Sequence, residues 1–152
     1  MITIACLYPY ELTLYGEMGN IKALMYALDK GNIKYKLEII EKDTKLELDN
    51  YDFIYVGSGR PKCLEDVKKR LLPYKEEFLN YIEKDKILLA TGNAISILDF
   101  LDLYDVKYYK KREVHDVDAT TSLCKGHIVG FQNTEYLIDS TKNIIFNINE
   151  GI

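Results

Sequence analysis

The chain has 152 residues, of which 47% are hydrophobic and 29% charged, with a net charge of −4. This length and composition predict one globular domain over residues 1–152 and exclude a disordered or fibrous chain. No apolar run reaches the roughly 20 residues of a membrane span, and the first residues lack the basic region of a signal peptide, so we expect no membrane partner.

Apolar segments of strand type and helix type alternate through the first two thirds of the chain. We expect Asn20 to cap the first helix, Gly31 to end it, and Pro73 to kink or divide the second. The alternation predicts an α/β fold, a mostly parallel sheet with helices on both faces. The expected strands are 2–7, 33–39, 52–56 and 86–90, and the helices are 20–30, 61–84 and one that follows Asn93.

The final third of the sequence has a different character. Short β-prone segments between polar turns predict extra strands, partly antiparallel, in this third. The basic and aromatic stretch from Lys107 to Arg112 has a composition that suits nucleic acid, but the acidic net charge favours a solvated strand face. We therefore expect no nucleic-acid partner. The predicted extra strands are 106–114, 126–131, 136–138 and 144–148.

Three loops follow predicted strands, namely 8–20, 57–61 and 91–94. In parallel α/β sheets, ligands bind where strands end and helices begin. The loop Gly57-Ser58-Gly59 has two interpretations. Its backbone N–H groups could face an anion or a developing oxyanion, or the glycines could form a tight turn that needs positive φ. The turn is favoured, because glycine pairs often follow strands.

The segment Thr91-Gly92-Asn93 has the layout of a nucleophile elbow, between a strand and a helix. A cysteine there would gain thiolate character from the helix dipole, whereas a threonine hydroxyl needs a base beside it. A β-branched residue also resists the unusual φ of a strained elbow. We therefore favour Thr91 as a helix cap over Thr91 as a nucleophile.

The histidines and cysteines give no strong site. Cys124 and His127 form one Cys-x-x-His pair without a second pair, so no metal site is predicted. We interpret His115 and His127 as structural or surface groups and Cys6 as a core residue. Cys63 starts a helix, and no partner histidine is evident from the sequence. The odd number of cysteines favours the reducing cytoplasm, and no cofactor is predicted.

Four stretches of the sequence match motifs of a known protein family in the same order, at 7–21, 52–59, 86–98 and 128–133. The first reads LYPYELTLYGEMGNI and the last IVGFQN. Over essentially the whole chain they resemble the GatD-like glutamine amidotransferases, in the cobyric-acid-synthase (CobB/CobQ) branch of the class I family. The resemblance implies a class I glutamine amidotransferase-like, flavodoxin-like fold. It also implies that the oxyanion or glutamine is bound by Gly57, Ser58, Gly59, Gly92 and Arg112.

The sequence departs from this family at two places. The family elbow reads roughly C-G-G-Y-Q, whereas this chain has T-G-N-A-I from Thr91. The family's catalytic histidine lies in a Y-L-H-G strand well after an E-G-I segment. Here E-G-I occupies residues 150–152, so we expect the sequence to be a C-terminally truncated piece of a longer protein.

Three functions stay open on the sequence. The favoured one is a non-catalytic glutamine amidotransferase-like subunit that pairs with a Mur-ligase-like synthetase in amidation of the peptidoglycan precursor lipid II. The second is an active glutaminase that uses an atypical nucleophile, Thr91 or Cys63. The third is a binding module that holds a small anionic ligand at the 57–59 loop and the helix after Gly92. Glutamine is the expected small-molecule ligand, if there is one.

Overall fold

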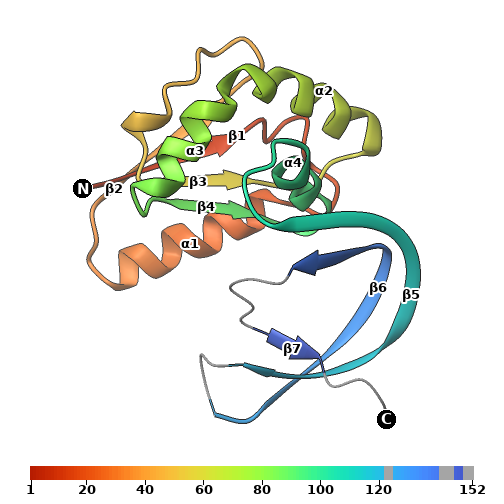
Figure 1. The fold of residues 1–152 in the computed structure, drawn as a ribbon. Helices are drawn as coiled ribbons and strands as arrows, with labels where there is room; N and C mark the ends of the chain where they lie inside the picture. The colour runs from red at the N-terminus through yellow and green to blue at the C-terminus, as the bar shows by residue number, and fades with distance from the viewer. Residues whose placement is uncertain (122–124, 141–145, 149–152) are drawn as a thin grey trace. The chain divides into compact units, whose positions relative to one another are not determined.

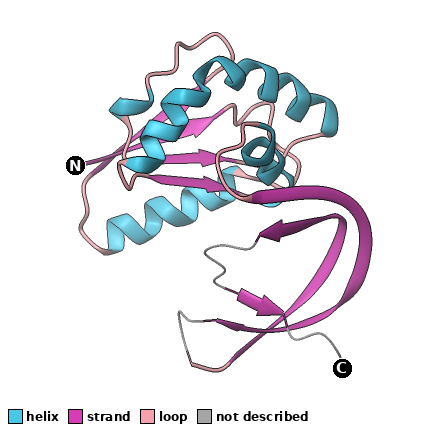
Figure 2. Cartoon of the chain, viewed as in Figure 1, coloured by secondary structure: helices cyan, strands magenta, loops and turns pink. Residues whose placement is uncertain are grey.

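The computed structural model describes residues 1–121, 125–140 and 146–148. The chain divides into two compact units, Met1–Leu103 and Tyr104–Ile152, which are drawn in Figures 1 and 2. Each unit has its own sheet. The expectation of one domain over 1–152 stays a prediction.

The first unit is built on a four-stranded parallel sheet in the order β2-β1-β3-β4. The two central strands carry continuous apolar runs because both of their faces are covered, whereas the edge strand β2 alternates apolar and polar residues. This strand order is the flavodoxin-like one, which confirms the predicted fold class. The strands are β1 (Ile2–Leu7), β2 (Tyr35–Ile40), β3 (Phe53–Val56) and β4 (Ile87–Ala90).

Helices cover both faces of this sheet, with α1 on one face and α2, α3 and α4 on the other (Figure 1). Tyr55 of β3 packs on the α1 side, whereas its neighbours Ile54 and Val56 pack on the opposite side. The α-helices are α1 (Met18–Lys30), α2 (Pro61–Leu71), α3 (Lys75–Glu83) and α4 (Ile95–Phe100). The 3₁₀ turns are η1 (Leu48–Asn50), η2 (Leu72–Tyr74) and η3 (Gly92–Ala94).

Helix boundaries follow the sequence signals in part. Pro73 lies in the 3₁₀ turn η2 and divides the predicted 61–84 helix into α2 and α3, as expected. Gly31 ends α1, also as expected. The predicted cap at Asn20 is wrong, because α1 already begins at Met18. The Asn20 side chain donates a hydrogen bond to the Tyr55 hydroxyl at 2.7 Å instead.

The second unit forms an antiparallel sheet in the order β6-β5-β7. Its strands are β5 (Val106–Thr121), β6 (His127–Ser140) and β7 (Phe146–Ile148). The predicted extra strands are confirmed, but the predicted break at 132–135 is wrong, since these polar residues pair with β5 inside one continuous strand. Cys124, residues 144–145 and the E-G-I segment at 150–152 lie outside the described residues.

In the part of the chain that the structure describes, no helix is long and apolar enough to cross a membrane.

The core of the first unit predicts a matched pair of substitutions. Ile54 of β3 is fully buried, whereas Ile87 of the edge strand β4 is 56% exposed. We expect Ile54→Ala to lower the free energy of unfolding by about 2–5 kcal/mol, because it leaves a cavity under α2 to α4. Ile87→Ala, the control, should lower it by about 1 kcal/mol or less. Urea denaturation followed by circular dichroism measures both, and equal losses would contradict this description of the core.

Candidate functional site

The three loops that the sequence singles out come together at the carboxyl ends of β1, β3 and β4. The Leu14 amide donates a hydrogen bond to the Ser58 carbonyl oxygen at 3.1 Å, which joins the first loop to the second. The Ser58 hydroxyl donates to the Thr91 carbonyl oxygen at 3.1 Å, which joins the second loop to the third. The parallel strands thus deliver these loops to one edge of the sheet.

A buried carboxylate lies at the centre of the three loops. Glu17 is only 5% exposed. Its Oε2 atom accepts hydrogen bonds from the Tyr55 hydroxyl at 2.6 Å and the Thr91 hydroxyl at 2.8 Å. Ser58 also favours the charged form of this carboxylate. These donors satisfy a charge that would otherwise be very unfavourable to bury.

The hydroxyl protons around Glu17 are fully used. A hydroxyl group has one proton, and Tyr55 and Thr91 both give theirs to the carboxylate. The two hydroxyl oxygens lie 2.9 Å apart and share this acceptor. The Tyr55 oxygen in turn accepts a hydrogen bond from Asn20 at 2.7 Å. Thr91 is therefore a neutral alcohol that acts as a donor to an anion.

The titration of Glu17 reflects two opposing effects. Burial by itself would raise the pKa of its carboxyl. Hydrogen bonds from Tyr55, Thr91 and Ser58 favour the charged form and hold the pKa below its ordinary value. Glu17 also stands at the N-terminal end of α1, where the helix dipole favours a negative charge. Glu17 is consequently ionised at neutral pH.

Thr91 occupies the elbow without strain. Its backbone is extended, with φ −110° and ψ 144°, and Gly92 takes the left-handed conformation with φ +53°. The steric objection to a β-branched residue at this position therefore does not apply. The prediction that the Thr91 side chain caps the following helix is wrong, because it makes no cap hydrogen bond and instead binds Glu17. A charged acceptor is a stronger partner for the hydroxyl than a backbone amide nitrogen.

The glycines of the 57–59 loop are required for space. Neither Gly57 nor Gly59 has positive φ, so the favoured turn explanation is wrong. A Cβ atom on Gly57 would lie 2.7 Å from both Cβ and Cγ of Glu17, and one on Gly59 would lie 2.4 Å from Leu12 Cδ2. At Gly92 a Cβ would meet Ser58 Oγ at 2.4 Å, in addition to the positive φ. The loops thus approach one another more closely than side chains would allow.

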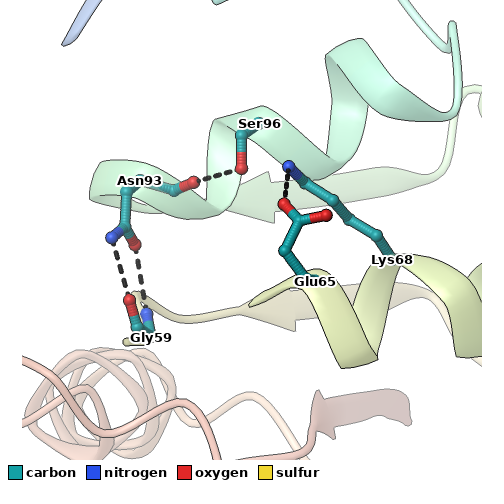
Figure 3. A network of polar contacts seen from close by, with 5 residues as sticks. All are labelled: Gly59, Glu65, Lys68, Asn93 and Ser96. Carbon is teal, nitrogen blue, oxygen red and sulfur yellow. Dashed lines mark hydrogen bonds and ion pairs between the residues drawn. The ribbon is translucent and has the colours of Figure 1, made fainter. Parts of the chain in front are cut away.

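Asn93 holds the loop after β3 against the start of the 3₁₀ turn and α4 (Figure 3). Its Nδ2 atom donates to the Gly59 carbonyl oxygen at 2.9 Å, and its Oδ1 atom accepts from the Gly59 amide at 3.1 Å. The Ser96 hydroxyl donates to the Asn93 carbonyl oxygen at 2.8 Å. Within the 57–59 loop, the amide of Gly59 is therefore engaged by an acceptor from this chain, the Asn93 side chain.

The remaining residues considered as candidates belong to other elements of the chain. Arg112 is exposed on β5 of the second unit, where the pairing register shifts between Lys110 and Glu113. His115 is exposed on the same strand, and His127 Nδ1 lies 2.7 Å from Asp118 Oδ1. Cys63 lies in the first turn of α2 as a free thiol. Among the described residues, no group of three or more His, Cys, Asp or Glu side chains could hold a metal ion.

Sequence reasoning missed Glu17, Tyr55 and Asn93. Signals for two of them exist in hindsight. A tyrosine inside a fully buried strand needs a partner for its hydroxyl, and Tyr55 is 1% exposed. Glu17 lies within the longest motif, next to Gly16, whose φ of +77° turns the chain into α1. Asn93 carried no local signal, because its partner Gly59 is 34 residues away.

Comparisons with known proteins find relatives of this chain in sequence. No family model matches the chain. The chain is 28% identical over 97 residues to subunit GatD of the lipid II isoglutaminyl synthase (glutamine-hydrolyzing) of Streptococcus pneumoniae, covering 64% of this chain and 37% of that protein. It is 26% identical over 148 residues to the GatD subunit of Staphylococcus aureus, covering 87% of this chain and 60% of that protein.

The fold also matches a solved structure. The crystal structure of a glutamine amidotransferase from Thermotoga maritima has a TM-score of 0.60 with this chain at 14% identity, covering 95% of this chain and 66% of that one. The chain therefore has a glutamine amidotransferase-like fold. In sequence it is similar to GatD subunits, and it spans from about a third to three fifths of the length of these curated relatives.

The packing of Gly57 on Glu17 predicts opposite effects for two glycine substitutions. Gly57→Ala should lower the free energy of unfolding by about 1–3 kcal/mol, because the new methyl overlaps the Glu17 stem. Gly19→Ala, in α1 with nothing near its Cβ position, should raise it by about 0.5–1 kcal/mol through helix propensity. Thermal and urea unfolding of both variants measure this contrast. Equal effects would contradict the close approach of Glu17.

The lowered pKa of Glu17 predicts a pH dependence of stability. Because its folded-state pKa lies below the unfolded value of about 4.3, Glu17 stabilises the fold above that pH, and this contribution is lost as the pH falls through the folded-state pKa. Glu17→Gln should be less stable than the natural chain at pH 7, and the difference should shrink on acidification. Glu76→Gln, at an exposed position of α3, is the control. A difference independent of pH would contradict an ionised Glu17.

Proposed function

We propose that the chain is a glutamine amidotransferase-like subunit that does not hydrolyse glutamine and that pairs with a Mur-ligase-like synthetase in the cytoplasm. The similarity to GatD supports this, because both relatives are named as subunits of a lipid II isoglutaminyl synthase. In such a pair the chain would serve amidation of the peptidoglycan precursor. Its contribution would be structural or regulatory, through the retained fold.

The state of Thr91 is the observation that carries the non-catalytic part of the proposal. Amide hydrolysis through a covalent acyl intermediate needs an activated nucleophile and donors for the oxyanion. Thr91 is an alcohol whose proton is held by Glu17 at 2.8 Å. The Gly59 amide, a loop donor suited to an oxyanion, donates to the Asn93 side chain at 3.1 Å. The Thr91 hydroxyl and this loop amide are thus both engaged by groups of this chain.

One observation favours an active enzyme as the second candidate. The Thr91 hydroxyl donates to a carboxylate, and an alcohol nucleophile requires an adjacent base. However, hydrogen bonds hold the pKa of Glu17 below its ordinary value despite its burial, which makes the carboxylate a weak base toward an alcohol. Cys63, the other atypical nucleophile considered, lies on α2 and is not among the hydrogen-bonding partners of Thr91, Ser58 or Glu17. The non-catalytic function is therefore preferred.

A glutaminase assay tests this function directly. We expect the purified chain, alone or with a Mur-ligase-like synthetase, to release glutamate from glutamine at no more than roughly a thousandfold above the uncatalysed rate. The Thr91→Ala variant should show the same rate. The GatD subunit of Streptococcus pneumoniae with its own synthetase serves as the positive control.

The same samples test the partner. We expect the chain to co-purify with the synthetase, and the Thr91→Ala variant to do so equally. Rapid turnover that Thr91→Ala abolishes would overturn the non-catalytic assignment, and a chain that never associates with a Mur-ligase-like protein would overturn the pairing.

A further inference from the structure

The donors around Glu17 form a recognition site for a carboxylate. The hydroxyls of Tyr55 and Thr91 donate to one carboxylate oxygen at 2.6 and 2.8 Å. They come from β3 and from the residue after β4, whereas the carboxylate comes from the loop after β1. Nothing in this donor set requires the carboxylate to belong to the protein.

The backbone is shaped to admit the Glu17 side chain. The absence of a Cβ at Gly57 leaves room for the Cβ and Cγ atoms of Glu17, which would otherwise lie 2.7 Å from it. Tyr55 is held in turn by Asn20, whose side chain donates to the Tyr55 oxygen at 2.7 Å. Replacing Glu17 by alanine removes a carboxylate and one methylene from beside the Tyr55 and Thr91 hydroxyls.

We propose that Glu17 is an internal carboxylate ligand that closes a carboxylate-binding site, and that the site accepts small monocarboxylates such as formate or acetate once this side chain is removed. This inference deepens the proposed function. It rests on that function for one point, the position of the site at the elbow. In the natural chain, an external carboxylate or acyl oxygen must displace Glu17 to reach these donors.

The number and kind of donors favour a carboxylate over a larger anion. Two hydroxyls supply two hydrogen bonds, and both go to one oxygen of the planar carboxylate. The space vacated in Glu17→Ala is that of one planar carboxylate group and a methylene. Sulfate has four oxygens and a tetrahedral shape, so it would leave acceptors unpaired in a buried site.

Chemical rescue of Glu17→Ala tests the proposal. We expect its thermal midpoint to rise in sodium formate or acetate relative to sodium chloride of equal ionic strength. At ten times the dissociation constant, the folding equilibrium should shift about 11-fold. Sulfate should raise the midpoints of the variant and of the natural chain equally, through its general effect on protein surfaces. The natural chain and Glu76→Ala, which loses an exposed carboxylate, should respond to formate no more than to chloride.

A second variant assigns the effect to the donors. Adding Thr91→Val to Glu17→Ala removes one hydroxyl at nearly constant volume, and should weaken the apparent affinity for formate about tenfold. If Glu17→Ala does not fold in chloride, recovery of its circular dichroism spectrum in formate supports the proposal. Failure in both salts, while Glu17→Gln folds, contradicts it.

Two further results would overturn the inference. One is an equal response of Glu17→Ala and Glu76→Ala to formate, and the other is a formate response unaffected by Thr91→Val. The experiment uses neither glutamine nor a synthetase. Its failure would therefore leave the non-catalytic function standing, and loss of the partner interaction would leave the carboxylate site standing.

Discussion

A buried carboxylate needs hydrogen-bond donors from the protein to replace the water that it has lost. The arrangement of this site depends on the donors that surround Glu17. Its donors belong to β3 and to the residue that follows β4. Breaking a buried charge away from its partners costs several kcal/mol, which exceeds the worth of a typical neutral hydrogen bond. One anion, Glu17, therefore holds the loops together, and Gly57 leaves room for the Cβ and Cγ atoms of Glu17.

This constraint accounts for the conformation of the Thr91-Gly92-Asn93 segment. The elbow needs a residue of positive φ after the strand, and Gly92 supplies it. The position before it then needs only to satisfy Glu17, which a threonine hydroxyl does. A thiolate there would face a carboxylate of the same charge. A fold similar to that of a glutamine amidotransferase does not by itself imply the same chemistry. In this chain, the elbow position makes an internal hydrogen bond to a carboxylate.

Much of the fold could be predicted from the sequence because its determinants are local. Apolar runs identified the four strands, Pro73 divided a helix, and the carboxyl ends of parallel strands placed three loops together. The site could be predicted only as a location. Glu17 meets Thr91 across 74 residues and Tyr55 across 38, and no local pattern encodes such pairs. The same limit explains why the predicted helix cap at Asn20 is wrong, since its side chain donates to the hydroxyl of Tyr55, 35 residues away.

The central claim is that Thr91 is a hydrogen-bond donor to Glu17 and not a nucleophile. Covalent trapping tests it most directly: the chain is incubated with an electrophilic diazoketone analogue of glutamine, alone and with a Mur-ligase-like synthetase, and peptides are mapped by mass spectrometry. We expect the peptide that contains Thr91 to stay unmodified, while the GatD subunit of Streptococcus pneumoniae, named as glutamine-hydrolyzing, is labelled under the same conditions. An adduct on the Thr91 oxygen would contradict the claim.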